Sequence, residues 1–68
     1  MEFTLNIKMD NAAFGNDDGE GLAQGSEVAR ILRSLASVVE DMDDLADFER
    51  RLMDVNGNRV GKAEVLED

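Results

Sequence analysis

The chain has 68 residues, with sixteen acidic and seven basic side chains, a formal net charge of −9, no histidine and no cysteine. Without cysteine, a disulfide framework and a thiolate zinc site are excluded. A chain this short buries only about 60% of its unfolded surface, so we expect one small domain, residues 1–68. The apolar runs are too short for a membrane span.

The start of the chain lacks the basic and apolar regions of a signal peptide. We therefore expect a soluble, intracellular and strongly acidic protein. Direct binding to nucleic acid is not expected, because that requires a basic face that displaces counterions.

Residues 1–9 alternate between apolar and polar side chains. Met1, Phe3, Leu5, Ile7 and Met9 fall on one side, and the residues between them fall on the other. This period of two predicts a strand with one buried face.

Residues 10–25 combine four glycines with acidic residues and contain no basic residue. Glycine raises the entropic cost of ordering and the acids repel one another, so a long surface loop is predicted. Phe14 and Leu22 are its only large apolar residues, and we expect them to attach the loop to the core.

The clearest helix is predicted from about Glu27 to Asp41, with Ser26 as its N-cap and Glu27 in the first turn. Its apolar positions recur at intervals of three and four, which indicates one face packed on a core. These positions are Val28, Ile31, Leu32, Leu35, Val38, Val39 and Met42.

Residues 40–49 can be interpreted in two ways. Leu45, Phe48 and Leu52 have helical spacing, with Asp44 as a possible cap. The alternative, which we favour, is a connector with room for one helical turn, followed by a strand that begins near Arg50.

Residues 52–61 then predict a hairpin. Asn56 and Gly57 could form a two-residue turn, but a three-residue loop fits better, with Asp54 first in a type I turn and Gly57 left-handed in a bulge. In that register Leu52 faces Val60. Gly61 marks a second irregularity, after which Ala63 and Val65 return to the core side.

The predicted fold class is α+β. One helix packs on a small three-stranded antiparallel sheet, in the order strand, helix, strand, strand, with a long acidic loop before the helix.

Two kinds of chemistry find little support in the sequence. Asp54, Asn56 and Asn58 alternate as calcium ligands do, but Arg59 and Val65 stand where a calcium loop needs glycine and a bidentate acid; a hairpin turn explains the same residues. Catalysis lacks a histidine, cysteine or tyrosine partner. We therefore expect no enzyme, no metal and no cofactor.

The acidity is segregated along the chain. Residues 10–25 carry a charge of −4 and residues 40–49 carry −6, whereas all other residues together carry +1. Acids at the C-terminus of a helix oppose the macrodipole by about 0.3–1 kcal/mol each. Solubility alone would not explain that cost, whereas recognition of a basic partner would.

The predicted partner-binding residues form two groups. The main group is Glu40, Asp41, Asp43, Asp44, Asp47 and Glu49, and the second is Asp10, Asp17, Asp18 and Glu20. Closely spaced carboxylates can offer a phosphate-like field to a cationic channel, since duplex DNA carries one charge per roughly 1.7 Å of its axis.

Three segments of the chain together resemble a family of very small phage and prophage proteins. They are Phe3–Ile7 followed by Asp10–Phe14, Glu27–Leu32, and Asp54–Gly61. Some members resemble anti-CRISPR proteins, and this chain is similar to inhibitors of type I-C CRISPR–Cas. The resemblance implies an acidic DNA mimic that blocks target-DNA binding by the surveillance complex Cascade, in the cytoplasm of the infected bacterial host.

Two functions are therefore weighed. The first is a monomer or weak dimer that inhibits a basic nucleic-acid-binding protein without enzymatic activity. The resemblance implies that this partner is a subunit of a CRISPR–Cas surveillance complex. The second is a small regulatory module of a phage or mobile element that binds through shape, its acidity serving solubility.

Overall fold

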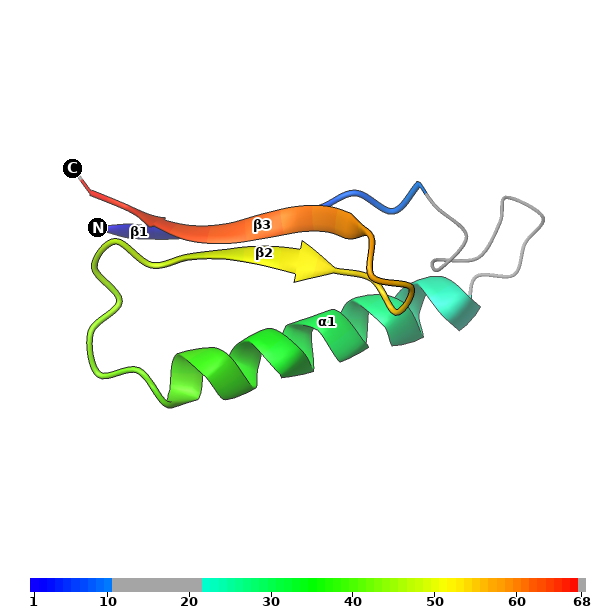
Figure 1. Ribbon diagram of the computed structural model, residues 1–68, viewed down its shortest axis with the longest axis horizontal. Coiled ribbons are helices and arrows are strands. Elements are labelled where there is room, and N and C mark those ends of the chain that lie inside the picture. Colours follow the sequence, from blue (N-terminus) through cyan, green and yellow to red (C-terminus); the bar gives the residue numbers. More distant parts are fainter. Residues whose placement is uncertain (11–21, 68) are drawn as a thin grey trace.

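The computed structural model describes residues 1–10 and 22–67, and for Leu22 and Ala23 it describes the backbone alone. The order of elements is β1 (Glu2–Ile7), α1 (Leu22–Glu40), β2 (Glu49–Met53) and β3 (Arg59–Leu66). The strands form one antiparallel sheet in the order β1-β3-β2, and α1 lies along one face of it (Figure 1). The predicted α+β fold class is confirmed.

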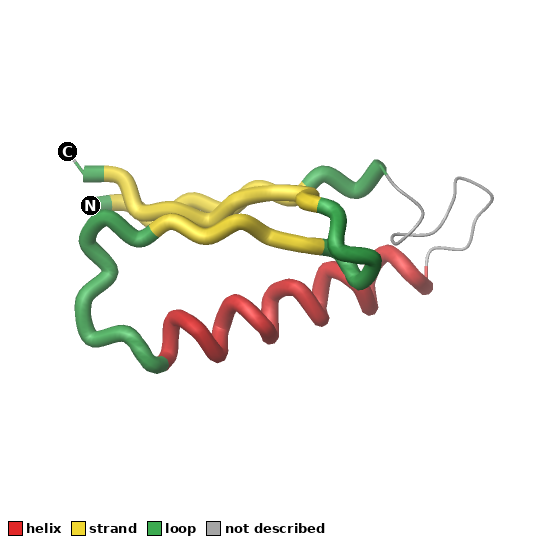
Figure 2. The backbone as a smooth tube through the Cα atoms, in the orientation of Figure 1, coloured by secondary structure: helices red, strands yellow, loops and turns green. Residues whose placement is uncertain are grey.

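The core lies between α1 and the β2–β3 half of the sheet. Its buried side chains are Ile31, Leu35, Phe48, Leu52, Val60, Ala63 and Val65. The other face of the sheet carries no helix within the described part of the chain (Figure 2). None of the helical residues described forms a segment long and apolar enough to cross a bilayer.

The first strand forms as predicted, but its apolar face is not buried. Phe3 and Leu5 pair with Val65 and Ala63 of β3 and therefore share their helix-facing side. They nevertheless remain 43% and 39% exposed, because β1 contributes only Ile7, partly buried, to the core. The ring of Phe3 stacks on that of Phe48, with 5.9 Å between the ring centroids.

The helix begins five residues earlier than predicted. It includes Leu22, Ala23 and Gln24, which are strong helix formers, so Ser26 is inside the helix and is not its N-cap. Residues 22–25 of the predicted loop therefore belong to the helix. Of the two predicted anchors, Phe14 lies outside the described residues and Leu22 is the first residue of α1. Of the predicted apolar stripe, Leu32 and Met42 are 42% and 38% exposed.

The hairpin has the predicted three-residue loop. The N–H of Gly57 donates to the carbonyl oxygen of Asp54 at 3.0 Å, and Gly57 has a φ of 85°, which glycine adopts without a steric penalty. The predicted pairing of Leu52 with Val60 is wrong: Leu52 pairs with Gly61, and Met53 with Arg59. A bulge leaves Val60 between these pairs, and its carbonyl oxygen accepts the N–H of Lys8 at 2.7 Å.

Candidate functional site

The main predicted acidic group lies in the segment that joins α1 to β2, which we call the acidic connector (residues 40–49). As favoured from the sequence, it is a connector, with β2 starting at Glu49. Leu45 and Phe48 turn toward the core, and the N–H of Phe48 donates to the carbonyl oxygen of Leu45 at 3.0 Å. With the apolar side chains inward, the carboxylates are left outward.

Two aspartates shape the backbone of the connector. Asp44 Oδ1 accepts the N–H of Ala46 at 2.9 Å, a local side-chain bond typical of turns. Asp47 has a φ of 63°, in the left-handed region that Asp tolerates better than most residues. Both residues are therefore suited to the turn as well as carrying charge.

Every acidic side chain of the connector is exposed. Within the described part of the chain, Glu49 alone among them forms an ion pair, with Lys62 Nζ at 3.5 Å. The structure thus brings the six predicted residues together at one end of the molecule and leaves the others without a cationic partner. These six are Glu40, Asp41, Asp43, Asp44, Asp47 and Glu49.

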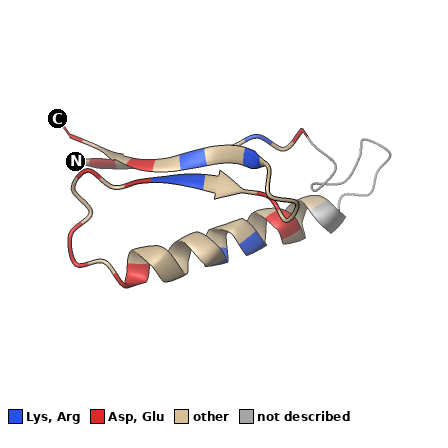
Figure 3. Ribbon diagram, in the orientation of Figure 1, with Lys and Arg blue, Asp and Glu red and all other residues tan. Residues whose placement is uncertain are grey.

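Further acids lie at the same end of the molecule. Glu49 is directly opposite Glu64 in the sheet, and Glu2, at the start of β1, pairs with Leu66 near the end of β3. Figure 3 shows this concentration of acidic residues where the connector meets the ends of the strands. Lys62 moderates the field locally, because it pairs with both Glu64 and Glu49. Its hydrogen bond to Glu64 raises the pKa of the lysine above its ordinary value.

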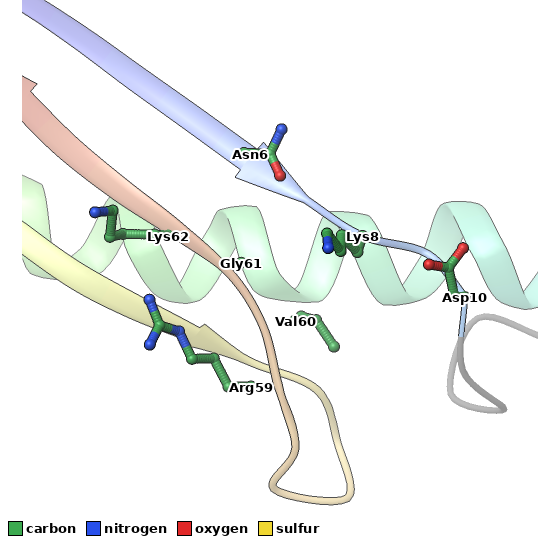
Figure 4. Close-up of a pocket in the computed structure, with 7 residues that line it drawn as sticks. All are labelled: Asn6, Lys8, Asp10, Arg59, Val60, Gly61 and Lys62. Atoms are coloured by element: carbon green, nitrogen blue, oxygen red, sulfur yellow. The ribbon is translucent and has the colours of Figure 1, made fainter.

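Of the second predicted acidic group, the structure describes Asp10 alone, and Asp10 lies away from the first group. Asp10 lies beyond the opposite end of β1, beside a groove of about 550 Å³ that it lines with Lys8, Arg59 and Lys62, among others (Figure 4). Asp17, Asp18 and Glu20 lie outside the described residues.

The cationic groove, defined by Lys8, Arg59 and Lys62, was missed from the sequence. Lys8 is far in the chain from Arg59 and Lys62, but the pairing of β1 with β3 brings it beside them. Lys62, within β3, also pairs with Glu49 and Glu64. Only a correct β1–β3 register could have revealed it. The molecule is therefore polarised along its strands, acidic at the connector and cationic near the groove.

Two further carboxylates are buried, and neither is free for a ligand. Glu27 accepts hydrogen bonds from Arg30 Nε at 2.8 Å and from the N–H of Val55 at 2.7 Å. Asp54 Oδ1 accepts the N–H groups of Asn56 and Asn58 at 2.9 and 2.8 Å. Both carboxylates bind groups of the chain itself. The hairpin turn therefore explains the alternating pattern of Asp54, Asn56 and Asn58.

Among the described residues, no group of three or more acidic side chains is arranged to hold a metal ion. Comparisons of the chain with protein-family models, curated proteins and solved structures gave no match.

Proposed function

We propose that the protein is a non-enzymatic inhibitor whose acidic connector occupies a cationic nucleic-acid channel of a partner protein. The observation that carries the proposal is the gathering of exposed carboxylates on one short connector, where Glu49 alone has a cationic partner among the described residues. Such a field raises the rate of encounter with a basic channel and competes there with nucleic acid.

The position of these acids supports recognition more than solubility. Glu40 is the last residue of α1, and the last turn of the helix has no basic residue. Acids here oppose the helix macrodipole, whereas acids elsewhere on the surface would give the same solubility without that cost.

The resemblance to anti-CRISPR proteins directs the proposal to a particular partner. We take it to be a subunit of a type I Cascade complex, blocked on the path of its target DNA. Effectors of this kind hold their duplexes in positively charged channels, to which an acidic end of a small protein is complementary.

The test compares two double variants that change the net charge equally. Asp41→Lys/Asp43→Lys alters the connector at side chains that make no hydrogen bond or ion pair within the described part of the chain. Asp17→Lys/Asp18→Lys, in the second predicted group, is the matched control, because the connector alone is proposed to enter the channel. Asp44 and Asp47 are kept, because they shape the turn.

Each variant is titrated against Cascade and labelled target duplex, with DNA displacement followed by fluorescence anisotropy and folding by circular dichroism. We expect the connector variant to lose on the order of tenfold or more in inhibition, and the control to lose much less. Equal inhibition by the connector variant and the unaltered protein would overturn the proposal.

A salt titration of the same complex separates this function from binding through shape. An electrostatic interface weakens as ionic strength rises, and we expect affinity to fall steeply. Affinity that holds or strengthens with salt indicates an apolar interface and favours a regulatory module whose acidity serves solubility.

A further inference from the structure

The two edges of the sheet are not equally protected against pairing with another strand. On β2, Arg50 lies on the helix-facing side between Phe48 and Leu52. An inward-facing charge is a device that blocks edge pairing. On β1 that face is apolar throughout, with Phe3, Leu5 and Ile7 in a row.

The direction of the backbone hydrogen bonds along β1 shows which of its residues face the edge that no other described strand pairs with. The N–H of Lys8 donates to Val60 of β3. Backbone groups alternate in direction along a strand, so Asn6 and Thr4 also face β3. The backbone groups of Phe3, Leu5 and Ile7 therefore point outward from the sheet.

We propose that a second copy of this chain pairs with β1 in antiparallel orientation, about a two-fold axis at Leu5. In that register Leu5 of one copy meets Leu5 of the other, and Phe3 meets Ile7. All are hydrogen-bonded pairs, because these residues carry the outward backbone groups. Their side chains lie on the helix-facing side, so the half-exposed apolar row of one copy packs against that of the other.

Charge specifies the same register. Glu2 of each copy lies opposite Lys8 of the other, on the open face of the joined sheet. A parallel or shifted pairing would lose these opposite-charge neighbours.

The size of the core gives the reason for such a contact. Within the described part of the chain only seven apolar residues are fully buried, and the chain has no cysteine. Chains this small commonly need a disulfide, a metal or oligomerisation to supplement the core. A two-fold contact of identical edges also closes, so it stops at a dimer.

A single introduced cysteine tests the axis, since the chain has none of its own. Cα atoms of a hydrogen-bonded antiparallel pair are about 5.5 Å apart, within the range of a disulfide. Under mild oxidation we expect Leu5→Cys to form a covalent dimer. Leu32→Cys, on α1, is the matched control, because Leu32 and Leu5 are 42% and 39% exposed; we expect it to stay monomeric.

Charge exchange tests the register by sedimentation velocity. Glu2→Lys and Lys8→Glu each put like charges opposite one another, and we expect each to weaken dimerisation about tenfold. The double variant Glu2→Lys/Lys8→Glu restores opposite charges and should regain the affinity. Within one copy the two residues are six apart on one strand, so the recovery requires the contact between copies.

The dimer is overturned by a monomer at millimolar concentration, by equal cross-linking of Leu5→Cys and Leu32→Cys, or by a double charge variant no better than the single ones. A protein that stays monomeric but binds a foreign strand at β1 overturns it as well. The proposal is independent of the proposed inhibition, because none of these experiments involves Cascade or DNA.

Discussion

Arg30 clamps the carboxylate of Glu27 with two hydrogen bonds, from Nε to Oε1 at 2.8 Å and from Nη2 to Oε2 at 3.1 Å. Oε2 also accepts the N–H of Val55 at 2.7 Å, and Arg30 Nη2 donates to the carbonyl oxygen of Met53 at 3.0 Å. The pair thus joins the N-terminal half of α1 to the β2–β3 turn. The sequence predicts Glu27 only as a favourable charge in the first helical turn. In the structure its buried carboxylate links the helix to the hairpin.

Glu27→Gln should lower the free energy of unfolding by about 1–3 kcal/mol, because it removes a buried, charge-assisted acceptor from the donors of Arg30 and Val55. Urea denaturation at neutral pH measures the loss. Glu67→Gln, at an exposed position, is the control and should change stability by less than about 0.5 kcal/mol. Equal stability of the two variants would contradict a structural role for Glu27.

The contribution of Glu27 should also depend on pH. Its pKa lies below the ordinary value of 4.5, chiefly because Arg30 donates to the carboxylate, and burial opposes this only in part. A depressed pKa in the folded state gives stability that is complete above about pH 4.5 and is lost as pH falls through the folded pKa. The stabilities of the unaltered protein and Glu27→Gln should therefore converge on acidification; a gap that persists at acid pH would be inconsistent with this.

The same substitution at two glycines should have opposite effects. A Cβ on Gly61 would lie only 1.9 Å from the carbonyl oxygen of Asn6 on β1, whereas one on Gly25 would meet nothing within 4 Å. Gly61→Ala must push two paired strands apart and should cost about 1–3 kcal/mol or more. Gly25→Ala lies inside α1 and should stabilise by about 0.5–1 kcal/mol. Thermal unfolding of both variants checks the signs, and a tolerated Gly61→Ala would show that β1 does not approach β3 so closely.

Features that depend on neighbours in sequence were predicted well. Gly57 was placed left-handed because a three-residue loop after Asp54 requires it, and the alternation of residues 1–9 identified a strand. Features that depend on distant packing were not predicted. The apolar alternation of residues 1–9 does not show that α1 leaves Phe3 and Leu5 uncovered. The bulge changes the pairing partner of Leu52 from Val60 to Gly61, and it depends on how β3 pairs with both β1 and β2.

The candidate site divides in the same way. The main acidic group lies on one short connector, so its proximity follows from the sequence alone. Asp10 was assigned to a second acidic group, yet it lies beside the cationic groove. That groove joins Lys8 to Arg59 and Lys62 through the sheet register, which local patterns do not encode.

Calcium should change the thermal stability no more than magnesium does. The carboxylate of Asp54 is occupied by the turn, with Oδ1 accepting two backbone N–H groups and Oδ2 accepting Asn58 Nδ2 at 3.2 Å. Melting temperatures in calcium chloride and in magnesium chloride at equal concentration should agree, since both salts only screen the net negative charge. A higher melting temperature in calcium alone would indicate a specific site.

Glu40 should show a conflict between stability and binding. It is the last residue of α1, in a turn without a basic residue, where a negative charge opposes the helix macrodipole. Glu40→Gln keeps the size of the side chain, removes that repulsion, and should raise the free energy of unfolding by about 0.3–1 kcal/mol. The same change removes one carboxylate from the acidic connector, so inhibition of DNA binding should weaken. Urea denaturation and DNA-displacement titrations measure the two effects on one sample, with Glu67→Gln as the control. A variant that gains stability and inhibits as before would show that Glu40 lies outside the contact surface. A variant that gains no stability would show that Glu40 does not oppose the helix macrodipole, and that cost would no longer support recognition.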